Sequence, residues 1–457
     1  MIKPALPKGT RDFTPEAVRK RRYLFQTIQH CFEAFGFEPI ETPAMENLST
    51  LLGKYGEEGD KLIFRILNNG DILPIARQAR DNRELANLLC EKALRYDLTI
   101  PFARFVVMNH HQLVFPFKRY QIQPVWRADR PQKGRYREFY QCDADIVGSR
   151  SLLNEVELVR LYQQVFARLS LRVQIRINHR KLLQALAACS GDPAWMGWIT
   201  TAIDKLDKVP VAEVEAELRQ RGLDDEAIKL VRAYVDLPGE PSEAFPAVLA
   251  LLRHHPDAVE GVKELEFILH HVASSLHDQA PVRVDFTLAR GLDYYTGTIL
   301  EVKSEELAMG SLGGGGRYDN LTGLFGLPDV PGVGISFGVD RIYDVMEALQ
   351  RFPADTRQAT QVLWLRMDDA WLTQALEYVM QLRAQGISAE IYPDAIKMDK
   401  QLKYASKKGI RFAVMMGSRE YEQQAVSLKD LWNGQQEQVP LHELVPTIQK
   451  KIQELPA

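Results

Sequence analysis

The segment from Tyr120 to Val147 carries side chains whose types and spacing suit the binding of a charged, aromatic ligand. Arg127, Gln141 and Asp145 are polar, and the aromatic Phe139 alternates with them. The intervening loop adds an excess of positive charge suited to phosphate, from Arg130, Lys133, Arg135 and Arg137 against Asp129. The sequence therefore predicts a wall that holds a ligand.

Two β-strands are expected to position these side chains, because apolar and polar residues alternate on both sides of the basic loop. One strand is predicted from Tyr120 to Arg127 and the other from Phe139 to Ile146. An alternative is a half-solvated hairpin whose polar side chains face water.

A second group of chemically active residues follows a predicted strand over Val282–Leu288. It lies in the segment ARGLDYYTG at a glycine-punctuated turn, and it comprises Arg290, Asp293, Tyr294 and Tyr295. Aromatic residues next to strands can also serve sheet packing alone.

Two glycine-rich segments come next. Gly313–Gly316 is expected to allow positive φ and to let the backbone lie against a ligand. GVGISFG, from Gly332 to Gly338, is predicted to run from a strand into a helix that carries Asp340 and Arg341. Neither segment has the spacing of a P-loop or a dinucleotide-binding motif.

Together these motifs resemble those of the histidyl-tRNA synthetases, a branch of the class II aminoacyl-tRNA synthetases. Arg127 and Asp129, a loop, then Arg135 and Phe139 resemble the second class II motif. ARGLDYYTG resembles a signature peculiar to the histidine-specific branch. The GVGISFG segment with Arg341 resembles the third motif.

The resemblance implies an enzyme that activates L-histidine with ATP and transfers it to the 3′ end of tRNA(His). It implies an α+β fold: a class II antiparallel sheet flanked by helices, a helical insertion and a C-terminal α/β anticodon-binding domain. ATP, Mg²⁺ bridging its phosphates, histidine and tRNA are the expected ligands.

It also implies roles for individual residues. Arg127 and Arg290 would hold the α-phosphate and the carboxylate. The ATP-binding residues would be Arg127, Asp129, Arg135, Phe139 and Arg341, with Phe139 stacking adenine. The histidine-binding residues would be Asp97, Thr99, Gln141, Asp145, Tyr294, Tyr295 and Tyr318. Aspartate replaces the glutamate of many relatives at positions 97, 129 and 145.

The N-terminal region contributes a predicted helix from Pro15 to Phe35 and then a proline-containing edge strand near Pro39 and Pro43. By resemblance this is the first motif, and it implies a homodimer through residues 25–43. Further on, Asp97 and Thr99 are expected on one face of an extended segment, and Pro101 in a first helical turn.

The expected domains are 1–177 (catalytic, first part), 178–280 (helical insertion), 281–348 (catalytic, second part) and 361–457 (α/β anticodon-binding). In the last of these, strands alternate with helices, which predicts a largely parallel core. Six basic residues lie between Lys397 and Arg411, and Tyr404 and Gln401 among them suggest an RNA surface.

Composition is that of an ordinary soluble protein, with 457 residues and a net charge of −3. The four cysteines are far apart, which argues against a zinc site or a disulfide framework. We expect a cytoplasmic protein with no membrane segment.

Two alternatives stay open: a non-catalytic, synthetase-like regulatory subunit of histidine biosynthesis, and another class II synthetase.

Overall fold

The computed structural model describes residues 3–52, 60–132, 134–206, 209–272, 280–289, 295–357 and 360–453. Arg290 and Tyr294 lie outside the described residues. The chain forms two compact units, the first of residues 1–12 and 24–351 and the second of residues 13–23 and 352–457. Each unit is considered separately below.

The first unit is built on a sheet with the strand order β1-β5-β6-β11-β10-β9-β7-β8. The end pairs β1–β5 and β7–β8 are parallel, and the pairs between them are antiparallel. The bounds are β1 Glu38–Pro39, β5 Phe117–Trp126, β6 Glu138–Val147, β7 Val173–His179, β8 Val282–Val284, β9 Thr298–Ser304, β10 Gly313–Tyr318 and β11 Gly332–Phe337. The predicted antiparallel sheet is confirmed.

The predicted hairpin is the pair β5–β6, and β6 continues into the sheet by pairing with β11. Every residue of β6 from Gln141 to Val147 is buried. Arg119 and Gln121 of β5 are fully buried as well. The alternative of a half-solvated hairpin is therefore wrong, because the polar face is covered by protein.

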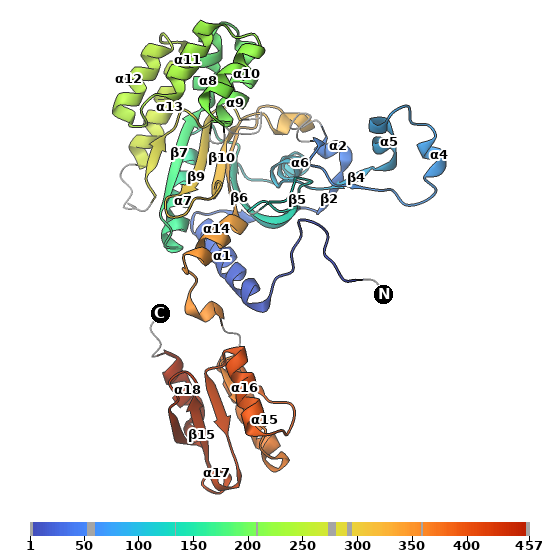
Figure 1. Cartoon of the computed structure of the whole chain (residues 1–457), viewed down its shortest axis with the longest axis vertical. Helices are drawn as coiled ribbons and strands as arrows, with labels where there is room; N and C mark the ends of the chain where they lie inside the picture. The colour runs from blue at the N-terminus through green and yellow to red at the C-terminus, as the bar shows by residue number, and fades with distance from the viewer. Residues whose placement is uncertain are drawn as a thin grey trace. The chain divides into compact units, whose positions relative to one another are not determined.

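Helices cover one face of this sheet (Figure 1). They are the part of α1 (Pro15–Ala34) from residue 24 onward, α7 Leu153–Arg168 and α14 Val339–Ala348. Phe32 of α1 and Tyr162 of α7 both contact the ring of Phe337 in β11. Because aromatic burial contributes strongly to core stability, these rings fix the helices against the strands.

One strand is shorter than predicted, and one glycine run has a different conformation from the one that glycine would allow. The strand predicted over Val282–Leu288 ends at Val284, because the Asp285 carboxylate accepts hydrogen bonds from the Thr287 N–H and hydroxyl and closes a turn. Gly313–Gly316 form strand β10 without positive φ. These glycines serve close packing instead, since a Cβ on Gly315 would overlap the Gly334 carbonyl oxygen of β11.

A small sheet, β2-β4-β3, precedes the hairpin. Its bounds and those of the nearby helices are β2 Met45–Asn47, α2 Leu48–Leu51, β3 Arg65–Ile66, α4 Leu73–Ala76, α5 Asn82–Leu89, β4 Lys92–Leu94 and α6 Thr99–Asn109. Thr99 begins α6 and so does not lie on an extended segment as expected. Pro101 lies in the first helical turn, as predicted.

The chain between β7 and β8 is helical, as predicted for the insertion. The helices are α8 Arg180–Cys189, α9 Met196–Asp204, α10 Val211–Gln220, α11 Asp225–Val235, α12 Pro241–Leu251 and α13 Pro256–Val272. Figure 1 shows them gathered beside β7.

The second unit contains a five-stranded sheet in the order β13-β12-β14-β15-β16. Its elements are β12 Val362–Trp364, α15 Leu372–Ala384, β13 Ala389–Ile391, α16 Met398–Lys408, β14 Phe412–Met415, α17 Ser418–Glu422, β15 Ala425–Asp430, β16 Gln436–Pro440 and α18 Leu444–Gln453. The pairs β12–β13 and β12–β14 are parallel, in line with the parallel core that was predicted, whereas β15 and β16 pair in the antiparallel sense. Among the described residues, no helix is long and apolar enough to cross a membrane.

Candidate functional site

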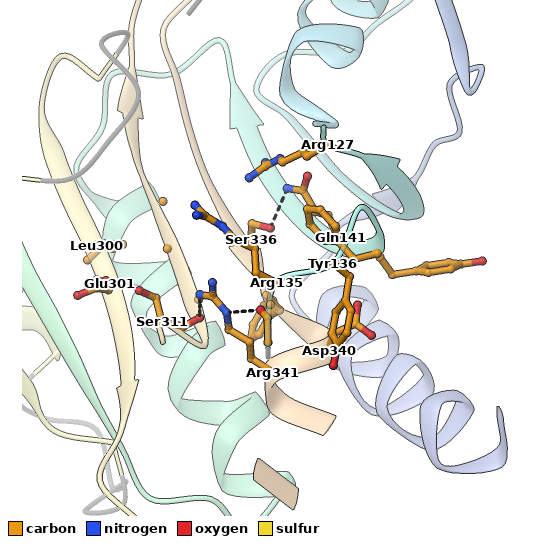
Figure 2. A pocket seen from close by; sticks show the side chains of 18 of the residues that line it. Arg127, Arg135, Tyr136, Gln141, Leu300, Glu301, Ser311, Ser336, Asp340 and Arg341 are labelled. Carbon is orange, nitrogen blue, oxygen red and sulfur yellow. Dashed lines mark hydrogen bonds between the residues drawn. The ribbon is translucent and has the colours of Figure 1, made fainter. Parts of the chain in front are cut away.

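A cavity of about 350 Å³ opens over β6, β9, β10 and β11 of the first unit (Figure 2). It is lined by all five residues predicted to bind ATP: Arg127, Asp129, Arg135, Phe139 and Arg341. The backbone of Gly313, Gly314 and Gly315 forms part of its wall, as the expected close approach of glycine to a ligand requires.

Arg127 is held at the end of β5, where its Nε donates to the Tyr96 carbonyl oxygen at 2.8 Å. Its guanidinium carbon lies 5.2 Å from the ring centroid of Phe139. The guanidinium is thus fixed beside an aromatic face, which leaves it well placed to hold an anion near a flat ring.

The loop between the hairpin strands is anchored by Arg341 of α14. Arg341 Nε donates to the Gly134 carbonyl oxygen at 3.1 Å and Nη1 donates to the Ser311 carbonyl oxygen at 2.9 Å (Figure 2). Arg135, half-exposed in this loop, lies 3.4 Å from the Asp129 carboxylate. Arg341 therefore organises the cavity wall in addition to supplying positive charge.

Two buried carboxylates, those of Glu301 and Asp340, also line this cavity. Glu301 of β9 is 5% exposed and accepts a hydrogen bond from the Ser311 hydroxyl. Its second oxygen lies 3.6 Å from Lys303 Nζ. The site consequently combines several arginines with a fixed, buried carboxylate from the sheet.

A second, smaller cavity of about 160 Å³ adjoins the first. Every described residue predicted to bind histidine lines it: Asp97, Thr99, Gln141, Asp145, Tyr295 and Tyr318. Asp97, 3% exposed, stands at the start of α6, and its Oδ1 accepts a hydrogen bond from the Ile100 N–H at 3.3 Å. The roles predicted for Arg290 and Tyr294 fall on residues that are not described.

Asp145 is held from two sides. The Tyr318 hydroxyl donates to Oδ1 at 2.5 Å, and Arg119 Nη2 lies 2.7 Å from Oδ2. Burial raises the pKa of Asp145, while the charge of Arg119 and the Tyr318 hydrogen bond oppose that rise. The carboxylate therefore has a fixed orientation and a positively charged neighbour.

Two residues of this region are absent from the set predicted from the sequence. Asp143 lines the smaller cavity, and burial raises its pKa to about 7. Arg119 stands directly opposite Asp145 in the β5–β6 register. The alternation that predicted the hairpin extends back to Arg119 and includes Asp143, so this signal could have found both.

The two cavities share six lining residues: Arg127, Gln141, Tyr295, Gly314, Gly315 and Ser336. Gln141 Nε2 donates to Ser336 Oγ at 3.2 Å across the shared wall (Figure 2). A ligand in the larger cavity and a ligand in the smaller one would therefore meet next to Arg127. That arrangement suits a reaction between a phosphate and a small zwitterion with a hydrogen-bonding side chain.

In the second unit, the RNA-surface role suggested for Gln401 is wrong. Its side chain is fully buried and accepts from the Arg366 N–H and donates to the Arg366 and Ile396 carbonyl oxygens. The Tyr404 hydroxyl donates to Glu390 at 3.0 Å. Five lysines are exposed at the start of α16 or along it: Lys397, Lys400, Lys403, Lys407 and Lys408, of which Lys408 is paired with Glu390 at 2.6 Å.

Comparison with known proteins gives concordant results. The sequence model of the family described as Histidyl-tRNA synthetase matches residues 9–76 and 83–342, and that of the Anticodon binding domain matches residues 361–451. The chain is 50% identical to a Histidine–tRNA ligase of Phocaeicola vulgatus over 450 residues, covering 98% of this chain and 99% of the relative. It is 49% identical to that of Porphyromonas gingivalis over 445 residues, covering 96% and 98%. The crystal structure of histidyl-tRNA synthetase from Nostoc sp. PCC 7120 superposes with a TM-score of 0.83 at 30% identity, covering 99% and 100%.

Proposed function

Because this chain belongs to the histidyl-tRNA synthetase family, we propose that it activates L-histidine with ATP in the two adjoining cavities and transfers it to tRNA(His). The observation that carries this proposal is the shared wall at Arg127 and Gln141. It supports ATP in the larger cavity and histidine in the smaller one, with their reacting groups adjacent.

In the activation step, a carboxylate oxygen of histidine attacks the α-phosphorus of ATP. The new P–O bond gives histidyl-adenylate, and the bond to the β-phosphate breaks to release pyrophosphate. Arg127 would stabilise the negative charge that gathers on the α-phosphate oxygens. In the second step a ribose hydroxyl at the 3′ end of the tRNA attacks the activated carbonyl, and AMP leaves.

Histidine would be held at both ends. Asp97, Thr99 and Gln141 are proposed to take the α-ammonium group, and Asp145 with Tyr295 and Tyr318 to take the imidazole. A carboxylate at the far end of the cavity accepts an N–H hydrogen bond, which apolar side chains cannot donate. A site built for that bond rejects analogues that lack it, because its own polar group would be left unpaired.

Mg²⁺ is proposed to enter with ATP. The described residues contain no group of three or more His, Cys, Asp or Glu side chains placed to hold a metal ion. Mg²⁺ commonly takes one or two carboxylates together with substrate phosphates and water, and Glu301 is suited to supply one oxygen. When bound, the ion would neutralise charge on the phosphates.

We also propose a homodimer formed around residues 25–43 and the neighbouring surface. The side chains of Met45 and Met108 are 56% and 69% exposed. Glu46, which follows Met45, forms an ion pair at 2.7 Å with Arg104, which precedes Met108 by four residues. Exposed apolar side chains of this size support an interface. Light scattering at micromolar concentration should show the dimer mass, and a monomer alone would contradict this proposal.

The second unit is proposed to bind tRNA, with the exposed lysines of α16 facing the phosphate backbone. We further propose a cytoplasmic location, because charged tRNA is used there.

The alternative of a non-catalytic paralogue would be favoured by loss of the arginines. They are present at positions 127, 135 and 341 and line the larger cavity.

Amino-acid-dependent exchange of pyrophosphate into ATP tests the function. Each of the twenty amino acids is supplied separately with ATP and Mg²⁺. We expect exchange with histidine alone at physiological amino-acid concentrations. Exchange with another amino acid, or none with histidine, would contradict the assignment.

A further inference from the structure

We propose that Arg119 is a positioning residue for histidine selection, which acts by fixing the Asp145 carboxylate at the end of the smaller cavity. This inference rests on the proposed function, because it assigns Asp145 to the imidazole. Arg119 lines neither cavity, so its effect on the substrate would pass through its neighbours, and Asp145 is the carboxylate with which it pairs.

The geometry supports a dedicated partnership. Arg119 and Asp145 are direct cross-strand partners in β5 and β6, and their side chains are 0% and 4% exposed. Arg119 Nη2 approaches Oδ2 of Asp145 at 2.7 Å, while the Tyr318 hydroxyl donates to Oδ1. With one partner on each oxygen, rotation of the carboxylate would break at least one of these interactions.

The surroundings of Arg119 explain why it stays in place. Its guanidinium carbon lies 4.1 Å from the ring centroid of Phe102, and Nη1 donates to Gln121 Oε1 at 3.4 Å. A guanidinium buried this deeply is costly unless an anion compensates it. The carboxylate of Asp145 is the anionic partner that the structure places against this guanidinium.

The pairing has a consequence for substrate binding. Aspartate is one methylene shorter than glutamate, so its carboxylate can reach fewer positions in a cavity. Fixing those oxygens by Arg119 and Tyr318 sets the direction of the lone pairs that remain for an imidazole N–H. Burial alone pushes Asp145 toward its neutral form by raising its pKa, and the charge of Arg119 opposes that change.

Steady-state pyrophosphate-exchange kinetics on the full-length protein, with histidine and ATP varied separately, test the proposal. Arg119→Met keeps much of the volume of the side chain but removes its charge. We expect the KM for histidine to rise about tenfold or more, the scale for losing a group that orients a ligand-binding side chain. The KM for ATP should change less than about twofold, because the substitution is expected to affect histidine binding and not ATP binding.

Two further variants separate positioning from folding. Arg119→Lys keeps the charge and should recover part of the histidine affinity. In the double variant Arg119→Met/Asp145→Asn both charges are absent, so it should fold even if the single Met variant does not. Its KM for histidine should match that of Asp145→Asn alone, since Arg119 acts only through Asp145 and the two effects are then non-additive.

Arg317→Met is the matched control. Arg317 forms a similarly buried ion pair with Glu155 at 2.5 Å, and neither residue lines either cavity. Arg317→Met should lower the melting temperature without a specific rise in the KM for histidine. An unchanged KM for histidine in Arg119→Met would overturn the proposal. So would KM values for histidine and ATP that rise equally, and to the same extent in Arg119→Met and in Arg317→Met. Absence of histidine-dependent exchange in the unmodified protein would instead overturn the proposed function.

Discussion

Gly334 of β11 lies directly across the sheet from Asp145 of β6, and a Cβ on Gly334 would overlap Oδ1 of Asp145. The carboxylate therefore occupies the space that a side chain at position 334 would fill. Asp145 cannot move aside cheaply, because Tyr318 and Arg119 hold its two oxygens. The absence of a side chain at Gly334 is thus a condition for the proposed imidazole site.

Gly334→Ala should consequently discriminate between the two substrates, and it should also lower thermal stability because it disturbs the buried pairing of Asp145. The added methyl group meets the end of a side chain, so we expect displacement of Asp145 and a raised KM for histidine with little change for ATP. Gly315→Ala provides the contrast, because its methyl group would overlap the backbone carbonyl oxygen of Gly334. That variant should lose thermal stability and affect both substrates together, which melting curves and exchange kinetics would show.

Asp145 itself should separate substrate selection from stability. Asp145→Ala is expected to raise the KM for histidine strongly, while Asp145→Asn should be milder because an amide oxygen still accepts one hydrogen bond. Both leave the fully buried Arg119 without its anion, which costs about 3–5 kcal/mol when one partner of a buried pair is removed. Both variants should therefore have a lower melting temperature than the wild type. A variant that keeps the wild-type melting temperature would contradict the buried pairing.

Asp143 predicts a pH dependence of stability. Burial raises its pKa in the folded protein to about 7, from an ordinary value of 3.8. Between these values the folded protein retains a proton that the unfolded chain has lost, so this residue makes stability fall as the pH rises. Asp143→Asn lacks that titration. The melting temperature of Asp143→Asn minus that of the wild type should therefore increase from about pH 4 to pH 7 and stay constant above pH 7. A difference that is the same at every pH would contradict the shifted pKa.

The exposed lysines of α16 predict a salt-dependent contribution to tRNA binding. Replacing Lys400, Lys403 and Lys407 by alanine should weaken binding and reduce the slope of log K against log salt by roughly 0.7 for each lysine that pairs with a phosphate. Arginine at the same positions keeps the charge and is the matched control. Pyrophosphate exchange should be unaffected in both variants, and unaltered tRNA binding in the alanine variant would exclude this face.

Much of the site was predictable because strand alternation is a local property of the sequence. The polar face of the hairpin and the glycine-rich strands were recognised, and every described candidate residue lines one of the two cavities. The division of these residues between two adjoining cavities was not predicted, because it depends on β10 and β11 pairing next to β6.

The errors have physical causes of the same kind. The glycines of β10 were expected to allow positive φ, yet they are extended and make room for Tyr162 and for the Gly334 backbone. Gln401 was expected to face RNA, but its amide group satisfies buried backbone groups. In each case a long-range packing partner decided the outcome, and a local pattern cannot reveal such a partner.

The division of labour between the cavities is tested most directly by exchange kinetics on Asp145→Ala and Phe139→Ala, with histidine and ATP varied separately in each. The account predicts that Asp145→Ala raises the KM for histidine and spares that for ATP, and that Phe139→Ala does the reverse. Equal effects of either variant on both substrates, or the opposite assignment, would contradict it.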